Sequence, residues 1–361
     1  MRIVVAMSGG VDSSVAAALL AEQGHDVIGL SMQLYDLSGD RPFGSCCSLE
    51  DLHDARRVAA ALNIPHYIMN FERQFDEQVI ANFVREYSAG RTPLPCAHCN
   101  SDLKFRTLAD RADGFGADAV ATGHYARVER DPVSGRHLLR RGVDATKDQA
   151  YFLFSLTQDQ LARACFPVGD RDKEAVRGYA RHRRLPVADK PDSQEICFIP
   201  DHDYKSFIER HAPSVSANGA IVDQAGRIVG RHEGIHRFTV GQRKGLGLAT
   251  APGAAPGTTS APMYVLALRP AERQVVVGPK QSLEQTRLTA SGVNWMIDAP
   301  AVELRVTAQI RHRHHPAPAT VRSIGDGHAE VVFDAPQMAI TPGQAAVFYD
   351  GDVVLGGGWI D

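Results

Sequence analysis

Two motifs in this sequence combine residue types and spacing that can do chemistry, and the first is a glycine- and serine-rich stretch near the N-terminus. It reads Ser8-Gly9-Gly10-Val11-Asp12-Ser13-Ser14 and stands between an expected strand at residues 3–7 and an expected helix at 13–23. Two glycines permit a tight turn whose amides face a ligand, and the helix N-terminus behind them is partially positive. This predicts a site for phosphate or pyrophosphate. The stretch has neither the Gly-Lys-Ser/Thr of the ATPase P-loop nor a G-x-G-x-x-G dinucleotide motif.

The second motif is a pair of cysteines beside prolines, with a third cysteine almost one hundred residues later. Cys96 and Cys99 lie in Pro93-Leu94-Pro95-Cys96-Ala97-His98-Cys99-Asn100, and Cys197 lies in Asp192-Ser193-Gln194-Glu195-Ile196-Cys197-Phe198. The prolines are expected to keep this segment in a loop, with Cys99 at or near the N-terminus of the next helix, where the dipole lowers a thiol pKa and favours the thiolate. Three interpretations stay open: small buried residues, part of a metal site, or sulfur-transfer chemistry in which one thiol carries sulfur and another resolves a disulfide.

The other three cysteines are assigned no chemical role. Cys165 stands on an apolar stretch expected to be helical, and the adjacent Cys46 and Cys47 line a loop. Six cysteines without a secretion signal indicate reduced thiols rather than a disulfide framework. No apolar run approaches the ~20 residues that span a bilayer, so we expect a cytoplasmic protein.

Length and composition indicate a globular protein of more than one domain. The chain has 361 residues, of which 44% are hydrophobic and 22% charged, which excludes global disorder. Lys and Arg number 39 against 42 Asp and Glu, giving a net charge of −3. A protein coated in positive charge is therefore excluded, whereas a local basic patch such as Arg181-His182-Arg183-Arg184 stays open.

The elements that must position these motifs alternate through the first half of the chain. Strands are expected at residues 3–7, 27–32, 67–70 and 119–122, and helices at 13–23, 49–62 and 71–89. Such alternation predicts a parallel sheet covered by helices on both faces.

Beyond about residue 200 the pattern changes to short alternating strands. They are expected at residues 263–268, 274–277, 302–310, 319–324, 329–333 and 345–349, separated by turns such as Asp326-Gly327, Asp350-Gly351 and Gly356-Gly357-Gly358. This spacing predicts an all-β module, a small barrel.

A set of ordered motifs gives the chain a family resemblance over essentially its whole length. They are Ala6-Met7-Ser8-Gly9-Gly10-Val11-Asp12-Ser13, Gly90-Arg91-Thr92-Pro93, Cys99-Asn100, Ala121-Thr122-Gly123-His124-Tyr125, Lys147-Asp148-Gln149, Phe166-Pro167-Val168-Gly169, Ile196-Cys197-Phe198-Ile199, Gly241-Gln242-Arg243-Lys244-Gly245-Leu246-Gly247, Thr341-Pro342-Gly343-Gln344 and Leu355-Gly356-Gly357-Gly358. In this order they resemble the bacterial tRNA-specific 2-thiouridylases, members of the N-type ATP pyrophosphatase (PP-loop) superfamily.

The resemblance implies an α/β fold of three domains. A parallel-sheet, adenine nucleotide alpha-hydrolase-like catalytic domain is expected over residues 1–200, a small central domain over 201–280 and a C-terminal β-barrel over 281–361.

The resemblance also implies an ATP site and a magnesium ion on the phosphates. Asp12 is the implied partner of Mg²⁺. The implied nucleotide contacts are Ala6, Met7, Ser8, Gly9, Gly10, Val11, Asp12, Ser13, Met32 and Gly123.

In the family, ATP adenylates the C2 carbonyl oxygen of the wobble uridine in tRNAs for Lys, Glu and Gln, with release of pyrophosphate. Cys197 corresponds to the cysteine that receives a persulfide from a donor such as a cysteine desulfurase or sulfur-relay protein. Its terminal sulfur attacks C2, and Cys99 closes a disulfide with Cys197 that releases the thiolated product, as ordinary thiol–disulfide exchange allows.

Implied tRNA contacts come from several parts of the chain. They are Leu94, Pro95, Cys96, His124, Lys147, Asp148, Gln149, Arg311, His312 and Gln344. From the residues alone, His124 reads as a satisfied polar residue at a strand end.

One position departs from the family pattern. Many members carry an Asp three residues before the equivalent of Cys99, whereas this chain has Cys96, which cannot supply the same permanent charge. Two routes therefore stay open: a persulfide enzyme with a spare thiol, which we favour, or a [4Fe–4S] enzyme whose cluster is held by Cys96, Cys99 and Cys197. A small-molecule ATP pyrophosphatase and a non-catalytic tRNA-binding sulfur carrier are rival functions.

Overall fold

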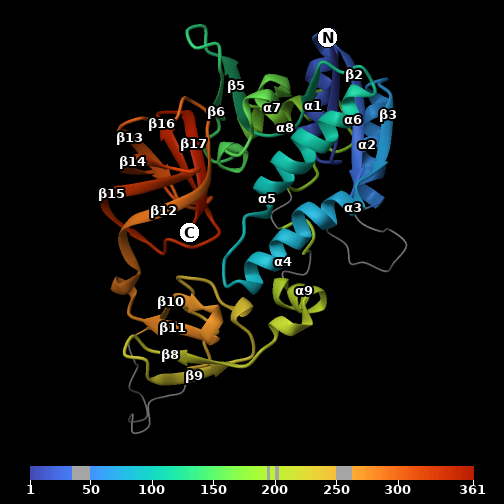
Figure 1. Ribbon diagram of the computed structural model, residues 1–361. Helices are drawn as coiled ribbons and strands as arrows, with labels where there is room; N and C mark the ends of the chain where they lie inside the picture. The colour runs from blue at the N-terminus through green and yellow to red at the C-terminus, as the bar shows by residue number, and fades with distance from the viewer. Residues whose placement is uncertain (35–48, 193–195, 200–202, 249–261) are drawn as a thin grey trace.

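The computed structural model describes residues 1–34, 49–192, 196–199, 203–248 and 262–361. Three bodies are visible in Figure 1: an α/β domain that contains the N-terminus, a β-barrel at the C-terminus, and a small sheet below both. Cys46, Cys47, Ser193, Gln194 and Glu195 lie outside the described residues.

The α/β domain is built on a five-stranded parallel sheet. The strand order is β3-β2-β1-β4-β7, and each neighbouring pair is parallel. The strands are β1 (Arg2–Ala6), β2 (Asp26–Gln33), β3 (His66–Asn70), β4 (Ala119–Ala121) and β7 (Ala164–Cys165). Cys165 was expected on a helix, and this is wrong: α7 (Gln158–Arg163) ends two residues earlier, and Cys165 pairs with Ala121 at the sheet edge.

Side chains of β1 alternate between two hydrophobic layers. Ile3 and Val5 pack with α1 (Val11–Glu22) and α2 (Leu49–Ala61), and Val4 packs on the opposite face. That face is covered by a first run of α3 (Glu72–Phe75), η1 (Asp76–Ile80) and α4 (Ala81–Ser88), and by a second run of α5 (Pro95–His98), η2 (Cys99–Thr107) and α6 (Leu108–Asp113). The predicted parallel sheet with helices on both faces is confirmed.

The C-terminal strands close into a six-stranded antiparallel barrel. They are β12 (Glu284–Trp295), β13 (Leu304–Gln309), β14 (Ala317–Gly325), β15 (His328–Met338), β16 (Ala345–Asp350) and β17 (Val353–Ile360). Pairing of β12 with both β15 and β17 closes the barrel, as the sequence pattern predicted.

A turn predicted at Gly356-Gly357-Gly358 is wrong, because all three glycines lie inside β17. A Cβ on Gly356 would lie 2.6 Å from the Asn294 carbonyl oxygen, and one on Gly357 would lie 2.7 Å from the Phe154 ring. The glycines thus permit close approach of neighbouring backbone and an aromatic ring rather than a change of direction.

A hairpin from the N-terminal half joins the barrel sheet. It consists of β5 (Ala126–Arg130) and β6 (His137–Arg141), and β6 pairs with β17. Asp352 accepts hydrogen bonds from Arg127 at 2.6 Å and Arg140 at 2.7 Å. The sequence pattern did not reveal this hairpin, so the sheet crosses the predicted border between the first and last domains.

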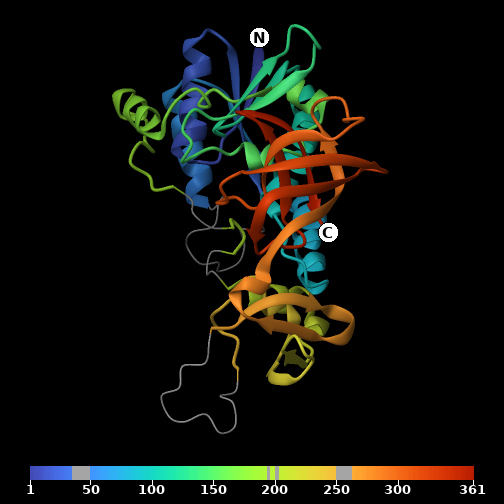
Figure 2. The same cartoon turned by 90° about the vertical axis from the view of Figure 1, so that its left-hand side faces the viewer.

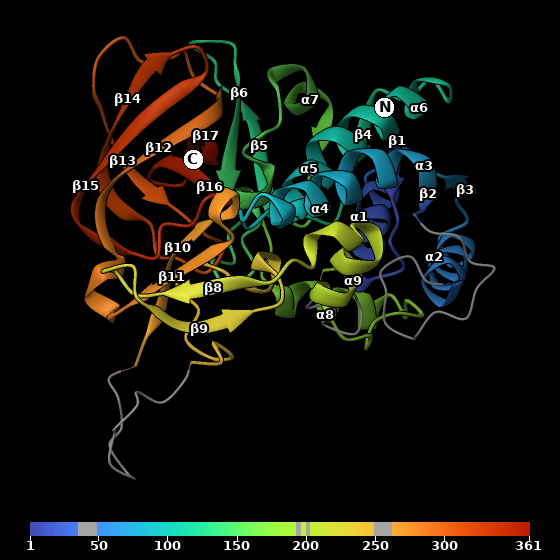
Figure 3. The ribbon, with the colours of Figure 1, turned by 60° about the horizontal axis from the view of Figure 1, so that its bottom comes forward.

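The small central sheet has its own core. It is ordered β10-β11-β8-β9, from β8 (Gly219–Val222), β9 (Ile228–His232), β10 (Tyr264–Arg269) and β11 (Gln274–Gly278). Its buried residues, among them Ile221 and Val277, form a separate cluster. Figure 2 shows this sheet projecting beyond the other two bodies, and Figure 3 shows β8 and β9 at its outer side.

The remaining helices are short. They are η3 (Ala150–Leu153), α7, α8 (Lys173–His182), α9 (Tyr204–His211), η4 (Pro213–Val215), η5 (Ile235–Arg237), η6 (Pro270–Glu272) and η7 (Lys280–Leu283). No helix among the described residues is long and apolar enough to cross a bilayer.

Candidate functional site

The glycine-rich loop lies at the carboxyl end of β1, where the order of the sheet reverses. Strand β1 has β2 on one side and β4 on the other, and ligands of open α/β sheets bind at such a switch point. The loop is held from within: the Ser8 amide donates to Ser13 Oγ at 3.2 Å, and Ser14 Oγ donates to the Gly10 carbonyl at 2.8 Å. The N-terminus of α1 therefore lies at the carboxyl end of the parallel strands, where its free amides can bind an anion.

Two glycines at this loop cannot be replaced without moving backbone. Gly9 has φ +73°, and a Cβ there would lie 2.2 Å from the Asp51 carbonyl oxygen. A Cβ on Gly123 would lie 2.5 Å from the Ser13 amide nitrogen. Gly123 therefore lies against the first turn of α1, beside the loop with which the sequence grouped it.

The other residues expected at the nucleotide occupy β1, β2 and the start of α1. Met7 and Met32 are buried, and Asp12 is half-buried. Met32 packs in the core on the α4 side of the sheet. The structure gathers the loop residues and Gly123, whereas Met32 serves the core.

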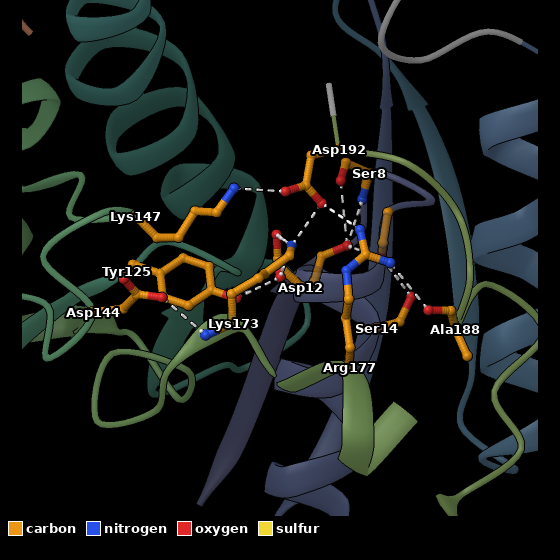
Figure 4. A network of polar contacts seen from close by, with 12 residues as sticks. Ser8, Asp12, Ser14, Tyr125, Asp144, Lys147, Lys173, Arg177, Ala188 and Asp192 are labelled. Atoms are coloured by element: carbon orange, nitrogen blue, oxygen red, sulfur yellow. Dashed lines mark hydrogen bonds and ion pairs between the residues drawn. The ribbon is translucent and has the colours of Figure 1, made fainter. Parts of the chain in front are cut away.

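Asp12 belongs to an ionic network that no sequence motif indicated (Figure 4). Its carboxylate accepts hydrogen bonds from Lys173 Nζ at 2.8 Å to each oxygen and from the Tyr125 hydroxyl at 2.8 Å. Asp192 accepts from Lys147, Lys173 and Arg177, each at 2.8 Å. These partners lie far apart in sequence, so only the fold brings them together.

Charges in the network set its protonation. Partial burial raises the pKa of Asp192, but hydrogen bonds from Lys147 and Lys173 and their positive charges outweigh it and lower the pKa to about 2. Burial and the Asp12 carboxylate raise the pKa of Tyr125 far above its usual value. At neutral pH Asp192 is thus an anion and Tyr125 a hydroxyl donor.

Cys96 and Cys99 are helical rather than in a loop, which corrects the expectation from the neighbouring prolines. Pro95 is the first residue of α5, a position where proline is well tolerated, and the helical run continues through η2. Cys96 is exposed and Cys99 is buried.

Cys197 is held next to the same helices. Phe198 stacks edge-on against Phe75 and Phe83 of the first helical run, with ring centroids 5.7 and 5.1 Å apart. Cys197 is partly buried and packs against the hydrophobic cluster that contains Cys99. Both cysteine-bearing segments thus border one core.

The barrel fastens the segment that precedes Cys96. The side-chain amide of Gln344 donates to the Thr92 carbonyl at 3.0 Å and the Pro93 carbonyl at 3.3 Å, and the Thr92 amide donates to the Pro342 carbonyl at 2.8 Å. His98 stacks on Trp359 with ring centroids 4.6 Å apart and planes at 2°. A cavity of about 250 Å³ beside them is lined by residues of α4, this segment and the barrel.

Three family models match successive parts of the chain. Residues 1–201 match the family model described as the tRNA methyl transferase HUP domain, 205–279 the tRNA methyl transferase PRC-barrel domain, and 285–360 the aminomethyltransferase beta-barrel domain. The tRNA-specific 2-thiouridylase MnmA of Geotalea uraniireducens is 51% identical over 100% of this chain and 95% of its own length. The chain belongs to the tRNA-specific 2-thiouridylase MnmA family.

Other relatives agree with this membership. The MnmA of Geobacter metallireducens is 52% identical over 100% of this chain and 96% of its own length. Among solved structures, a 4-thiouridine synthetase–RNA complex with bound ATP is 17% identical, with a TM-score of 0.35 over 59% of this chain and 50% of that one. NMN synthetase from Francisella tularensis is 16% identical, with a TM-score of 0.33 over 59% and 76%. Neither TM-score is high enough to bear on this chain.

In this MnmA family member, several residues expected at tRNA hold the protein together. Asp148 accepts from the Gly142 and Ala150 amides and from Arg141, and Gln149 accepts from the Tyr125 amide at 3.0 Å. Lys147 Nζ donates to Asp192 at 2.8 Å. These three residues connect the β6–η3 segment to the ionic network.

His124 is a neutral ring beside this network. Its Nδ1 lies 2.7 Å from Thr122 Oγ1. Burial, helped by the Lys104 ammonium, holds the pKa of His124 well below its usual value. This bonded ring agrees with the polar residue that the residues alone indicated, and the implied tRNA contact of His124 stays a prediction.

Arg311 and His312 lie next to η3 on the barrel side. Arg311 donates to the Met338 carbonyl at 2.9 Å, and the exposed His312 packs on Phe152 with ring centroids 4.6 Å apart. His312 thus packs on the residue whose carbonyl accepts a hydrogen bond from Asn100 of η2.

The side chains that could hold the implied Mg²⁺ or an iron–sulfur cluster are few. Among the residues that the structure describes, no group of three His, Cys, Asp or Glu side chains could hold a metal ion. Asp12 offers one carboxylate, and Mg²⁺ commonly takes one or two carboxylates together with substrate phosphates. Asp12 therefore fits as a magnesium partner only with a nucleotide. Cys96, Cys99 and Cys197, all among the described residues, do not form such a metal-binding group.

Proposed function

We propose that this chain is an ATP-dependent tRNA uridine 2-sulfurtransferase acting on cytoplasmic tRNAs for Lys, Glu and Gln. The observation that carries the proposal is identity of about half of all residues, over the whole chain, with relatives named tRNA-specific 2-thiouridylase. The glycine loop at the sheet switch point supports the use of ATP, since it can hold a polyphosphate. Asp12 would hold Mg²⁺ together with the nucleotide phosphates, and the ion would supply charge neutralisation.

In the first step, the uridine C2 carbonyl oxygen attacks the α-phosphorus of ATP and pyrophosphate departs. The nucleotide contacts proposed for this step are the loop residues and Gly123, with Met32 shaping the core behind them. Adenylation converts the C2 oxygen into part of a good leaving group, AMP. The protein's contribution is to orient the two reactants, and the rigid packing of Gly123 on the start of α1 supports that role.

In the second step, the terminal sulfur of a persulfide on Cys197 attacks C2, and AMP leaves. The Cys99 thiolate then attacks the Cys197 sulfur, which forms a Cys99–Cys197 disulfide and leaves the terminal sulfur on C2. A thiol reductant and a persulfide donor must restore Cys197 before the next turnover. Packing of both cysteine segments on one hydrophobic cluster supports this pairing.

The tRNA is proposed to approach along the cysteine helix and the barrel. The exposed Cys96, with Leu94 and Pro95, would meet the target base, and Arg311, His312 and Gln344 flank this position. Because Cys96 replaces an acidic residue common in the family, we assign it no acid–base role.

A nucleotide assay tests the ATP-dependent step. Purified chain, Mg-ATP and an unmodified tRNA-Lys transcript should form AMP and pyrophosphate. A transcript with cytidine at the wobble position should not support this release, because cytosine carries an amino group at C4 and no proton on N3, and so presents a different hydrogen-bonding edge to the site. AMP formation that ignores the tRNA, or its absence with both transcripts, would contradict the proposal.

A further inference from the structure

Three cationic side chains from different segments converge on one carboxylate beside the glycine loop (Figure 4). Lys147 Nζ lies 2.8 Å from Asp192 Oδ2, and Lys173 Nζ and an Arg177 Nη each lie 2.8 Å from Oδ1. Lys173 and Arg177 are only 12% and 22% exposed. Such charges remain partly inside the protein only when an anion compensates them.

The cluster lies at the loop itself. Lys173 Nζ contacts both oxygens of Asp12, the second residue of α1, whose N-terminus carries partial positive charge. The position of Lys173 is fixed by its backbone, since its amide donates to Asp144 at 3.0 Å at the start of α8. Arg177, one turn later on α8, also donates to the Ala188 carbonyl.

Three cations and three carboxylates make up this network. Lys147, Lys173 and Arg177 supply the positive charges, and Asp12, Asp144 and Asp192 the negative ones, but Asp144 bonds the Lys173 amide rather than a cationic group. All three cationic groups meet on the single carboxylate of Asp192, near the N-terminus of a helix, which is a setting for an anion larger than one carboxylate. A polyphosphate presents several charged oxygens to the same donors.

We propose that Lys147, Lys173 and Arg177 are the polyphosphate-binding side chains of this site, and that Asp192 stands in for the polyphosphate when no nucleotide is bound. The inference rests on the proposed use of ATP. Binding of the β- and γ-phosphates transfers the three cations from Asp192 to phosphate oxygens. Asp192 is then a competitor for the ligand, and its removal tightens polyphosphate binding.

The chain just before Asp192 is anchored independently of the three cations. Two residues earlier, Lys190 is held on α2 by Asp51 at 2.7 Å and Asp54 at 2.6 Å. This anchor does not involve the three cations. Cys197 follows Asp192 by five residues, so the exchange takes place in the segment that leads to the proposed persulfide cysteine.

Calorimetric titration of the full chain with magnesium-free pyrophosphate, and separately with AMP, tests the proposal. Asp192→Asn should bind pyrophosphate about tenfold more tightly, and Lys173→Met or Arg177→Gln about tenfold more weakly, the scale of one charge-assisted hydrogen bond. AMP affinity should change little. Asp189→Asn is the matched control, because Asp189 pairs with Arg181 at the surface and touches none of the three cations.

Equal or weaker pyrophosphate binding by folded Asp192→Asn would overturn the proposal. Unchanged pyrophosphate binding by both Lys173→Met and Arg177→Gln would also overturn it. Two cation variants are used because one of them could fail to fold, which circular dichroism would reveal. AMP formation with tRNA tests the proposed function independently of these affinities. Wild-type protein that forms AMP with tRNA but shows no Asp192 effect refutes this inference alone. Protein that shows the predicted affinities but never forms AMP with tRNA refutes the proposed function alone.

Discussion

A single methyl group would be enough to deform the proposed nucleotide site. A Cβ on Gly123 would lie 2.5 Å from the Ser13 nitrogen and 2.7 Å from the Asp12 carbonyl carbon, both backbone atoms that cannot rotate away. The sequence could suggest a role for Gly123 only through the family motif, because a lone glycine after a strand is also an ordinary turn. Its packing on α1 required the fold.

Gly123→Ala should therefore weaken ATP binding by about tenfold or more, since overpacking shifts the start of α1. Calorimetric titration with ATP measures the effect. Gly178→Ala is the matched control: a Cβ there meets nothing within 4 Å, and alanine stabilises a helix interior by up to about 1 kcal/mol. Unchanged ATP affinity in Gly123→Ala would contradict the packing argument.

His124 gives a pH dependence whose sign follows from its environment. Burial and Lys104 lower its pKa in the folded state, so the unfolded chain binds this proton more readily. Stability from His124 is present above its unfolded pKa, roughly 6.5, and is lost as the pH falls below it.

His124→Gln should reduce the loss of unfolding free energy between pH 6.5 and 5. The slope should fall by at most about 1.4 kcal/mol per pH unit, the value for one proton. Urea unfolding at a series of pH values checks this. Parallel profiles for the variant and wild type would show that His124 does not titrate as inferred.

At the scale of elements, the barrel acts on the cysteine helix from outside. The segment that enters α5 is tied to Gln344 and Pro342, and its His98 is stacked on Trp359. Sequence reasoning predicted the helices, the parallel sheet and the barrel because hydrophobic periodicity encodes them. The neighbouring prolines predicted a loop at Cys96 and Cys99, because proline disfavours helix interiors. The structure has a helix there, because Pro95 occupies its first position, where proline is tolerated.

Gln344→Ala should loosen this segment. The lost hydrogen bonds are worth about 1 kcal/mol, so amide exchange over residues 92–99 should accelerate and tRNA thiolation should slow, with ATP binding unchanged. Gln337→Ala serves as the control, because Gln337 bonds only within the barrel, to His314 and Ala335. If amide exchange over residues 92–99 is unaltered in Gln344→Ala, the barrel does not help to position Cys99.

Across the whole molecule, one hydrophobic cluster joins the α/β domain to the barrel. It includes Val4 of the parallel sheet, Phe154 after η3, and Tyr349 of β16. The hairpin β5–β6 extends the barrel sheet in the same region. The sequence could not reveal this union: the hairpin strands are rich in charge, and the glycines of β17 mimic a turn, although their missing side chains admit Phe154.

Calorimetric unfolding should accordingly show the α/β domain and the barrel melting in one transition. Gly357→Val should lower that shared transition, because its side chain would displace the Phe154 ring. The central sheet, whose core is separate, is free to melt on its own. Two transitions, with only the barrel affected by Gly357→Val, would contradict a shared core.

Thiolation of tRNA is the reaction that decides the proposed function. Wild-type protein, Mg-ATP, a persulfide donor and unmodified tRNA-Lys transcript are incubated without oxygen, and the tRNA is run on a mercury-containing gel, which retards thiolated RNA. We expect a retarded band that is lost with Cys197→Ser and with Cys99→Ser but kept with Cys165→Ser, whose residue lies on the edge strand β7. A band that survives both Cys99→Ser and Cys197→Ser, or no band although ATP and tRNA bind and the donor is active, would contradict the proposed function.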